Sequence, residues 1–247
     1  MMKTTPFPQF SIIACVVLAL ALPARAQMAI KGALLLEENF QKYATYTKEK
    51  LPVKAGWDVR LAHGVWKRSP EGVLVTWETG HQPVLVFEGA FGDAVIELDF
   101  RYREEPGKWA CCRVSATNST LNPRAYAASV WANVDYKSRA VGLVLEHDEW
   151  SPGHITQVSR KMTEFKPDTW YTLRLELIGN TVLTTCNGVT VVGTYEKFGI
   201  PKSSVWLATG LSTHELRKLR VYSARPDPSW APAAKAGTPP AAPKKSD

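Results

Sequence analysis

Residues 170–195 read WYTLRLELIGNTVLTTCNGVTVVGTY, and this stretch decides the fold. In residues 171–178 apolar side chains alternate with polar ones, a period of two that predicts a half-buried strand. Two more short runs of this kind follow, separated by the pairs Gly179-Asn180 and Asn187-Gly188. Both pairs tolerate the positive φ angles of tight turns. The stretch therefore predicts an antiparallel meander of three strands, whose apolar face needs a second layer to cover it.

The rest of the chain repeats this pattern and can supply the second layer. Residues 94–102, AVIELDFRY, alternate strictly, and the other apolar runs are short and bounded by Gly, Pro and Asn. The further expected strands include residues 33–40, 110–115, 126–134, 141–146, 154–161, 205–211 and 216–223. No stretch beyond residue 26 has a sustained helical period. The expected fold is all-β, a two-sheet antiparallel jelly-roll sandwich.

The two ends of the chain differ from this middle part. Residues 1–26 combine Lys3, an apolar run too short to span a bilayer, and the small-residue site Ala24-Arg25-Ala26, which together predict a signal peptide. Residues 226–247 are rich in Pro, Ala and Lys and predict a disordered tail. The expected product is a single domain, residues 27–225, that is secreted or periplasmic and has no transmembrane segment.

Charge and cysteine content exclude some partners and leave others open. Removing Lys3 and Arg25 lowers the formal charge from +7 to +5, and no basic run with interleaved aromatic residues predicts a nucleic-acid partner. Cys111, Cys112 and Cys186 remain after residue 26. An odd number of cysteines leaves at least one thiol free or paired between molecules, and a bridge from Cys111 or Cys112 to Cys186 is one alternative.

Several landmarks along the chain carry a resemblance to a known family. They are Glu38-Asn39-Phe40, the run GDAVIELDFR at residues 92–101, WYTLR at residues 170–174, Asn187-Gly188 and ELRKLRV at residues 215–221. Over residues 34–224 the chain resembles the 3-keto-disaccharide hydrolase domain family of secreted bacterial proteins. The resemblance implies a concanavalin A-like jelly roll, similar to glucanases and lectins, and the activity of a keto-sugar glycoside hydrolase.

The chain departs from the family pattern in two places. Where the family has Gly-Asn-Ser-Gly before a strand that carries an Arg, residues 107–113 read GKWACCR, so only Arg113 matches. The next strand of the family usually has an acidic residue, whereas residues 126–132 read YAASVWA and have no carboxylate. The ExDxxE pattern of laminarinase-like enzymes is also missing. A carbohydrate-binding module without catalysis therefore stands beside the enzyme as a hypothesis.

The densest group of titratable residues is Glu146-His147-Asp148-Glu149-Trp150. On a strand, Glu146 and Asp148 lie on one face, where two neighbouring carboxylates can act as acid and base because their pKa values are pushed apart. The same oxygens could hold a Ca²⁺ ion, although the chain shows no dedicated metal motif. A solvated loop after a strand is the other interpretation.

Further residues are candidates for substrate binding. Arg113 lies opposite Cys112 and Val114 on its strand, where its guanidinium could bind a sugar, or form an ion pair with a neighbouring strand. Trp131 and Trp150 offer aromatic faces to sugar rings. His154 and Gln157 follow a turn and can return to the same rim. Of the other tryptophans, we expect Trp57, Trp66 and Trp170 to pack inside the sandwich.

Three functional hypotheses follow from these residues. In the first, the chain is a glycoside-cleaving enzyme of the keto-sugar type, with Glu146 or Asp148 as acid and base and Arg113 orienting the substrate. In the second, it binds carbohydrate without catalysis through Arg113, Trp131 and Trp150. In the third, it is a structural cell-envelope domain that binds another protein.

Overall fold

The computed structural model describes residues 27–78, 80–105, 107–118, 125–133, 142–149 and 155–230. These residues form strands, turns and one short 3-10 helix, η1 (Glu196–Gly199). The strands are β1 (Ala29–Glu38), β2 (Leu51–Lys54), β3 (Trp57–His63), β4 (Val65–Arg68), β5 (Val73–Thr76), β6 (Val84–Phe91), β7 (Ala94–Tyr102), β8 (Cys111–Thr117), β9 (Tyr126–Asn133), β10 (Gly142–Asp148), β11 (Ile155–Lys161), β12 (Tyr171–Ile178), β13 (Thr181–Cys186), β14 (Val189–Thr194), β15 (Lys202–Thr209) and β16 (His214–Pro226).

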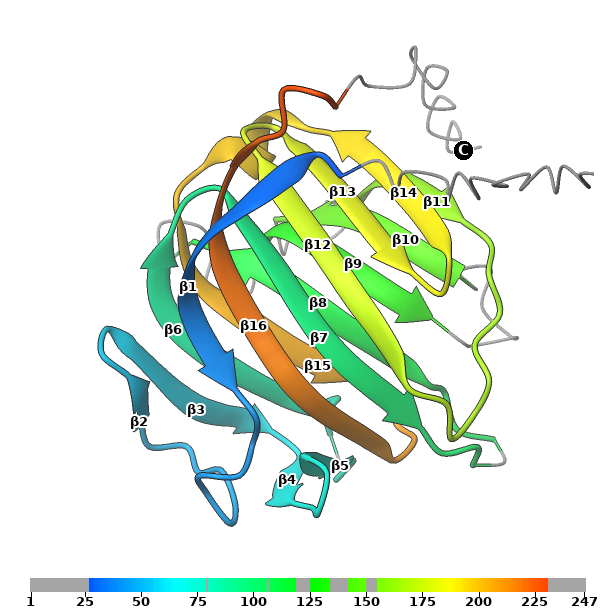
Figure 1. Ribbon diagram of the computed structural model, residues 1–247. Coiled ribbons are helices and arrows are strands. Elements are labelled where there is room, and N and C mark those ends of the chain that lie inside the picture. The colour runs from blue at the N-terminus through cyan, green and yellow to red at the C-terminus, as the bar shows by residue number, and fades with distance from the viewer. Residues whose placement is uncertain are drawn as a thin grey trace, which may run out of the picture.

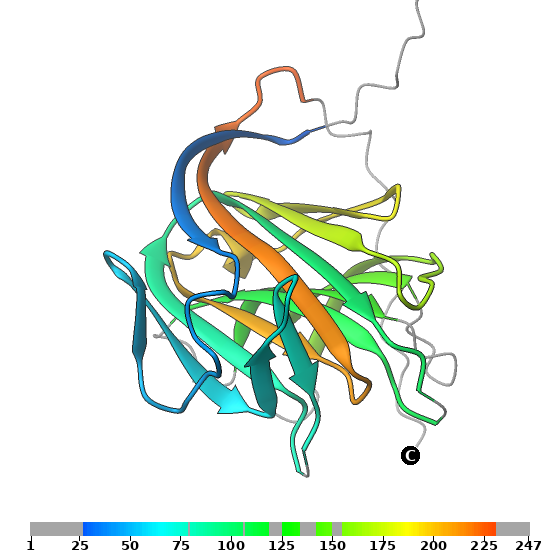
Figure 2. The ribbon, with the colours of Figure 1, turned by 60° about the horizontal axis from the view of Figure 1, so that its bottom comes forward.

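The strands build two antiparallel sheets of eight strands each. Sheet A has the order β14-β13-β12-β7-β16-β5-β4, and β1 also pairs with β16. Sheet B has the order β11-β10-β9-β8-β15-β6-β3-β2. Figure 1 shows most of sheet A in front of sheet B, and Figure 2 shows the two layers from another side. The expected two-sheet antiparallel sandwich is confirmed. We call the face of each sheet that points away from the other sheet its outer face.

The meander predicted from residues 170–195 is present as β12, β13 and β14 of sheet A. Its second turn has φ angles of 49° at Asn187 and 74° at Gly188, as a tight hairpin turn requires. Leu173, Leu175 and Leu177 are fully buried in the core between the sheets. Strand period and hairpin chemistry were therefore enough to predict this part of the fold.

The tryptophan assignments are confirmed at two positions and wrong at one. Trp57 and Trp66 are buried in the core. Trp170 instead lies on the outer side of sheet A, where the guanidinium carbons of Arg101 and Arg217 stand 4.6 and 3.9 Å from its ring centre. An indole between two cations gains a favourable electrostatic contact without core burial, so a large aromatic residue next to a strand need not face inward.

Strands β1 and β10 extend past the ends that the sequence predicted for them. Strand β1 begins at Ala29 because the Glu176 carboxylate accepts hydrogen bonds from the backbone N–H groups of Met28 and Ala29, each at 2.7 Å. Strand β10 continues through Asp148, which pairs with β11 on one side and β9 on the other. The acidic residues after 145 therefore belong to the sheet, and the solvated-loop interpretation is wrong for Glu146 and Asp148.

One end of the sandwich is closed by a close approach of the two sheets. A Cβ atom at Gly193 of β14 would lie 2.5 Å from the Val158 side chain and 2.9 Å from that of Leu145. Only a glycine lets β14 come this near to β10 and β11. Because Leu145 precedes Glu146, this contact helps to fix the strand that carries the acidic residues.

Some predictions concern residues outside the described ranges. The predicted signal peptide and residues 231–247 of the predicted tail are among them, whereas β16 runs to Pro226. Cys111, Cys112 and Cys186 are all buried and none is in a disulfide, so the proposed bridge is absent. In the described part of the chain, no helix has the length and apolar character needed to cross a membrane.

Candidate functional site

The candidate site lies on the outer face of sheet B, across β8, β9 and β10. On β8, Cys112 and Val114 point into the core, so Arg113 and Ser115 point outward. The register places Arg113 opposite Trp131 of β9. Paired residues of neighbouring strands project to the same side of a sheet, so these side chains share the outer face.

Arg113 is held tightly although it is charged and only 5% exposed. Its Nε donates to the hydroxyl oxygens of Ser115 at 3.0 Å and Ser129 at 2.8 Å. Its guanidinium carbon lies 3.8 Å from the ring centre of Tyr126 and 4.3 Å from that of Trp131. Among the described residues it has no carboxylate partner in an ion pair, and its buried Nη2 has no hydrogen-bond partner.

An unpaired guanidinium nitrogen away from water is energetically costly. The prediction that Arg113 points outward is confirmed. The ion pair with a neighbouring strand, which was the other interpretation of Arg113, is not found among the described residues. The two serine hydroxyls and two aromatic rings fix the side chain and leave one donor nitrogen without a partner. Such a donor is suited to an oxygen atom of a ligand.

Glu146 reaches the same face from β10. Leu143 and Leu145 point into the core, and Glu146, opposite Ser129 of β9, points outward. Its carboxylate accepts a hydrogen bond from the indole Nε1 of Trp131. Burial raises the pKa of Glu146, and the nearby charge of Asp148 raises it further, against the opposing effects of Arg113 and Trp131. A carboxyl group with a raised pKa is suited to proton transfer near neutral pH.

Asp148 and His147 lie on opposite faces of the end of β10. Asp148 is 5% exposed and pairs with Tyr126, one of the two rings against Arg113. His147 is fully buried, and its Nδ1 donates to the carbonyl oxygen of Ala127 at 2.9 Å. Its ring lies 4.7 Å from that of Tyr195, and burial lowers its pKa. His147 therefore lies on the inner side of the sheet and does not belong to the outer face.

The indole of Trp131 is already in contact with other side chains of the site. One side of its indole meets Arg113, and the ring of Trp109 lies 5.8 Å away at an angle of 34°. Its Nε1 is used by Glu146. Trp131 therefore orients the two charged groups of the site, and its contact with a sugar stays a prediction.

The remaining predicted residues are placed in part. Gln157 of β11 is exposed and lies opposite Glu146 in the register, on the same face. Trp150 and His154 lie outside the described residues, so their predicted roles stay predictions. We call Arg113, Ser115, Ser129, Trp131, Glu146 and Asp148 the Arg113 patch.

Trp206 of β15 is a neighbour of the patch that our sequence interpretation missed. It lies opposite Ser115, its ring meets that of Tyr126 edge-on at 5.4 Å, and its Nε1 donates to Ser204 at 3.0 Å. Val84, Val86 and Ala208 form a small apolar cluster against which it packs. The alternation in residues 202–209, where Trp206 falls between Val205 and Leu207, was the signal that could have placed it on the outer face.

The described residues offer few ligands for a metal ion. Across the described ranges, no three His, Cys, Asp or Glu residues come together in a way that could hold a metal ion. Glu146 and Asp148 offer carboxylate oxygens, whereas Ca²⁺ takes six to eight oxygen ligands in proteins. Calcium binding at these two residues therefore stays a prediction.

Comparison with protein families gives the identity of the domain. Residues 39–221 match the model of the 3-keto-alpha-glucoside-1,2-lyase-like domain. The chain belongs to this family. The resemblance deduced from the strand landmarks is thus confirmed, and the domain is a member of a carbohydrate-related family. No curated protein matches the chain.

Solved structures with the same fold are distant in sequence. A Bacillus subtilis protein of unknown function with a galectin-like fold is 15% identical, with a TM-score of 0.58 over 81% of this chain and 100% of the other. The endo-beta-1,3(4)-glucanase SCLam of family GH16 is 10% identical, with a TM-score of 0.55 over 81% and 96%. The carbohydrate-binding module CBM66 of Bacillus subtilis is 15% identical, with a TM-score of 0.52 over 68% and 96%. These similarities confirm the concanavalin A-like jelly roll.

The candidate carboxylates of the site lie on β10. The family pattern suggested an acidic residue on the strand that is β9 in this structure. Strand β9 has none in residues 126–132, but Glu146 of β10 stands opposite Ser129 of β9. The outer face thus has an acidic residue from β10, although β9 supplies none in residues 126–132. Cross-strand register, which the sequence does not display, accounts for this placement.

Proposed function

We propose that the chain is an exported, carbohydrate-active domain that cleaves a 3-keto-glucoside by elimination on the Arg113 patch. The observation that carries the proposal is the buried Nη2 of Arg113, which has no hydrogen-bond partner, on the same face of the sheet as Glu146, whose carboxyl pKa is raised. One group can bind the ketone oxygen and the other can accept a proton. The family description, which names a lyase acting on 3-keto-alpha-glucosides, supports this choice of chemistry.

The reaction depends on the acidity of the carbon next to a ketone. In a 3-keto-glucoside, the C2–H bond is activated by the carbonyl group at C3. Glu146 takes the C2 proton, and the negative charge that develops on the C3 oxygen is stabilised by the Arg113 guanidinium. The electron pair then forms the C1=C2 double bond as the C1–O bond breaks.

The protons of the reaction balance within the site. The leaving oxygen receives the proton that Glu146 has taken, so the products are an unsaturated keto sugar and a free alcohol. Burial keeps the pKa of Glu146 high, and the nearby Asp148 adds to this effect, which favours the uptake of the proton. Addition of water to the double bond afterwards gives the same net products as hydrolysis, so a lyase step and a hydrolase outcome are compatible.

The other predicted residues have supporting roles in this proposal. Trp131 orients Glu146 and Arg113, and Gln157 lies beside Glu146 for contact with sugar hydroxyls. Trp150 and His154 are proposed for the same rim on the basis of the sequence alone. Export to the periplasm or outside the cell follows from the predicted signal peptide, and mass spectrometry of the exported protein should find a chain that starts near Gln27.

The test uses methyl 3-keto-α-glucoside in deuterated water. We expect exchange of the C2 hydrogen and the ultraviolet absorbance of a conjugated enone, both lost in Glu146→Gln. Arg113→Lys should keep binding but slow turnover, because lysine lacks the planar fork of donors. Glu196→Gln, an exposed position away from the patch, is the matched control. Cleavage without C2 exchange would contradict the elimination mechanism.

The second candidate function is a carbohydrate-binding module without catalysis. The absence of a carboxylate on β9, where the family pattern has one, favours it. Binding of glycans with no turnover of any keto-glycoside would support this alternative. Neither binding nor turnover across a broad panel would favour the structural, protein-binding hypothesis.

A further inference from the structure

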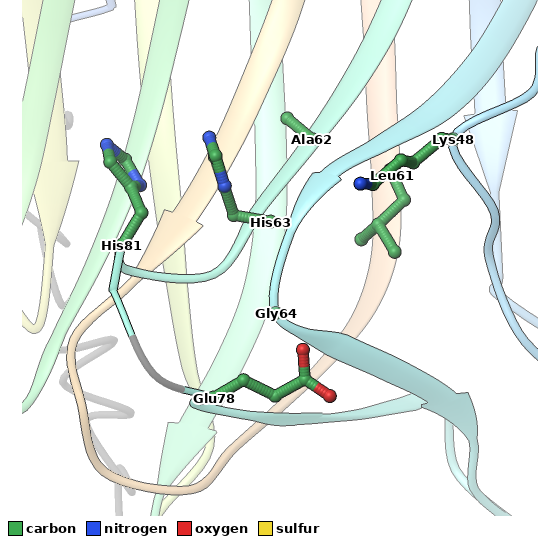
Figure 3. Close-up of a pocket in the computed structure, with 7 residues that line it drawn as sticks. All are labelled: Lys48, Leu61, Ala62, His63, Gly64, Glu78 and His81. Atoms are coloured by element: carbon green, nitrogen blue, oxygen red, sulfur yellow. The ribbon is translucent and has the colours of Figure 1, made fainter.

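A pocket of about 160 Å³ lies apart from the Arg113 patch, between the β3–β4 turn and the segment that precedes β6. Its lining includes Lys48, Ala62, His63, Glu78 and His81. Figure 3 shows the two imidazole rings side by side and the Glu78 carboxylate on the opposite side of the opening. Neither the family match nor the structural neighbours assign a role to these residues.

The pocket is held in shape by a tight turn. Gly64 has a φ of 79°, and a Cβ atom there would lie 2.7 Å from the Cβ of Pro83. This close contact fixes the turn against the segment that leads from His81 into β6. The rings of His63 and His81 consequently stack with their centres 4.2 Å apart and their planes 25° apart. The two imidazoles are thus positioned before any ligand binds.

The polar groups around the pocket suit a polyhydroxyl ligand. Nδ1 of His81 donates a hydrogen bond to the carbonyl oxygen of Gln82 at 2.8 Å, so Nε2 is the ring nitrogen that can face a ligand. Lys48 provides donors and Glu78 provides acceptors. Because one residue of each charge lines the pocket, the lining has no net preference for an anion or a cation. Sugar hydroxyl groups both donate and accept, so a sugar ring fits this mixture.

The register of sheet B connects the pocket to the Arg113 patch. Arg113 pairs with Ala208, Ala208 pairs with Val84, and Val84 pairs with His63. Three strand spacings of ~4.8 Å place His63 about 14 Å across the sheet from Arg113. The two sites therefore lie along one line on one sheet.

Between the two sites the sheet carries a buried apolar cluster, and the residues that a ligand could touch there are the partly exposed Ala62 and Trp206. Ala62 lines the pocket and also packs against the apolar cluster of Val84, Val86 and Ala208. The partly buried Trp206 packs against the same cluster. An aromatic ring on an apolar base is a common contact for the C–H face of a sugar. A chain of sugars can therefore follow this line from one site to the other.

We propose that the pocket is a distal subsite, which binds a sugar unit of an oligosaccharide whose reacting end lies on the Arg113 patch. The proposal rests on the proposed function and adds the substrate class to it. The span between the two sites requires an oligosaccharide longer than a disaccharide. The length of the glycan, and not only its reacting unit, then determines affinity.

Calorimetry on the full-length Glu146→Gln variant tests the proposal without turnover. The probes are three pairs of a disaccharide and its tetraose: maltose and maltotetraose, cellobiose and cellotetraose, and laminaribiose and laminaritetraose. We expect at least one tetraose to bind about tenfold more tightly than its disaccharide. The double substitution Lys48→Ala with His81→Ala should remove that advantage and leave disaccharide binding unchanged. Lys166→Ala, at an exposed position outside the pocket, is the control.

A second measurement guards against a variant that fails to fold. In protein with ¹⁵N-labelled histidine, the tetraose should shift the imidazole signals of His63 and His81, whereas the disaccharide should not. His63→Asn, with an unchanged melting temperature, should reduce the length effect in the same way. Equal affinities for disaccharide and tetraose in all three series, no binding, or unshifted signals would each overturn the subsite. Turnover of methyl 3-keto-α-glucoside, which cannot reach the pocket, would still test the proposed function separately.

Discussion

The ion pairs around Glu97 on sheet A and the Arg113 patch on sheet B use charge in opposite ways. On sheet A, Glu97 contacts Lys31 and Arg174, each at 2.8 Å, and Arg174 also donates to Glu176 at 2.8 Å. On sheet B, Arg113 contacts hydroxyls and aromatic rings, and no carboxylate among the described residues forms an ion pair with it. The charges around Glu97 are neutralised by their neighbours, whereas the Arg113 patch leaves a buried cation for which a ligand can be the partner.

The pKa values of Glu97 and Glu146 differ in the same way. Burial alone would raise the pKa of Glu97, but the hydrogen bonds and charges of Lys31 and Arg174 outweigh it, so this pKa lies below its ordinary value. In Glu146 burial dominates, and the pKa lies above its ordinary value. A carboxylate that its partners stabilise suits a structural role, and one that is kept poorly solvated suits proton transfer.

The largest expected effect separates the two faces by activity. Glu146→Gln should reduce turnover of a 3-keto-glucoside by about 10²–10⁴-fold, the range for loss of a general base. Glu97→Gln on sheet A should leave turnover within a factor of about two, because this residue forms ion pairs with Lys31 and Arg174 on the other sheet from the Arg113 patch. Steady-state kinetics on both variants measure this contrast. Equal losses in the two would remove the functional distinction between the faces.

The next effect concerns stability, and it is expected on sheet A and not at the Arg113 patch. Glu176 is 1% exposed and accepts from Met28, Ala29 and Arg174. Glu176→Ala should lower the free energy of unfolding by about 3–5 kcal/mol, since it leaves a cation and two N–H groups without their acceptor. Urea denaturation measures the change. The exposed ion-pair partner Glu37 is the control, and Glu37→Ala should cost at most about 1 kcal/mol.

A smaller effect tests whether Arg113 is kept for function. Arg113→Met should change the free energy of unfolding by no more than about 1 kcal/mol and can raise it, because a flexible apolar chain replaces a desolvated cation that has no carboxylate partner. Glycan binding should nevertheless be lost. The matched change Arg174→Met should be clearly destabilising, since it breaks contacts to Glu97 and Glu176. A large loss of stability in Arg113→Met would assign this residue a structural role.

The smallest effect concerns how the free energy of unfolding depends on pH. Glu97 and Glu146 should contribute to this dependence with opposite signs. Glu97, whose folded pKa is lowered, contributes stability above its ordinary pKa of 4.5 that is lost as the pH falls through the folded value. Glu146, whose folded pKa is raised, contributes stability below 4.5 that is lost as the pH rises through the folded value. Unfolding free energies of the wild type, Glu97→Gln and Glu146→Gln should therefore diverge at opposite ends of the pH range. Parallel curves would contradict the two pKa directions.

The elements of the fold could be predicted because they depend on local patterns. The period of two in residues 171–178 and the turn at Asn187-Gly188 are properties of neighbouring residues, and both match the structure. The same rule placed Arg113 and Glu146 on the side of their strands away from the core. The prediction for Trp170 was wrong because two arginines from other strands cover its ring, which no local pattern reveals.

The sequence by itself determined an all-β sandwich, the family, and the side of each strand on which the candidate residues lie. Only the tertiary structure decided which of them meet. Glu146 faces Ser129 because β10 pairs with β9 in one register, and Arg113 lies between Tyr126 and Trp131 because β8 pairs with β9. It also decided that no carboxylate of the described residues forms an ion pair with Arg113. Alternation is set by the geometry of one strand, whereas register and burial are set by contacts between segments far apart in the chain.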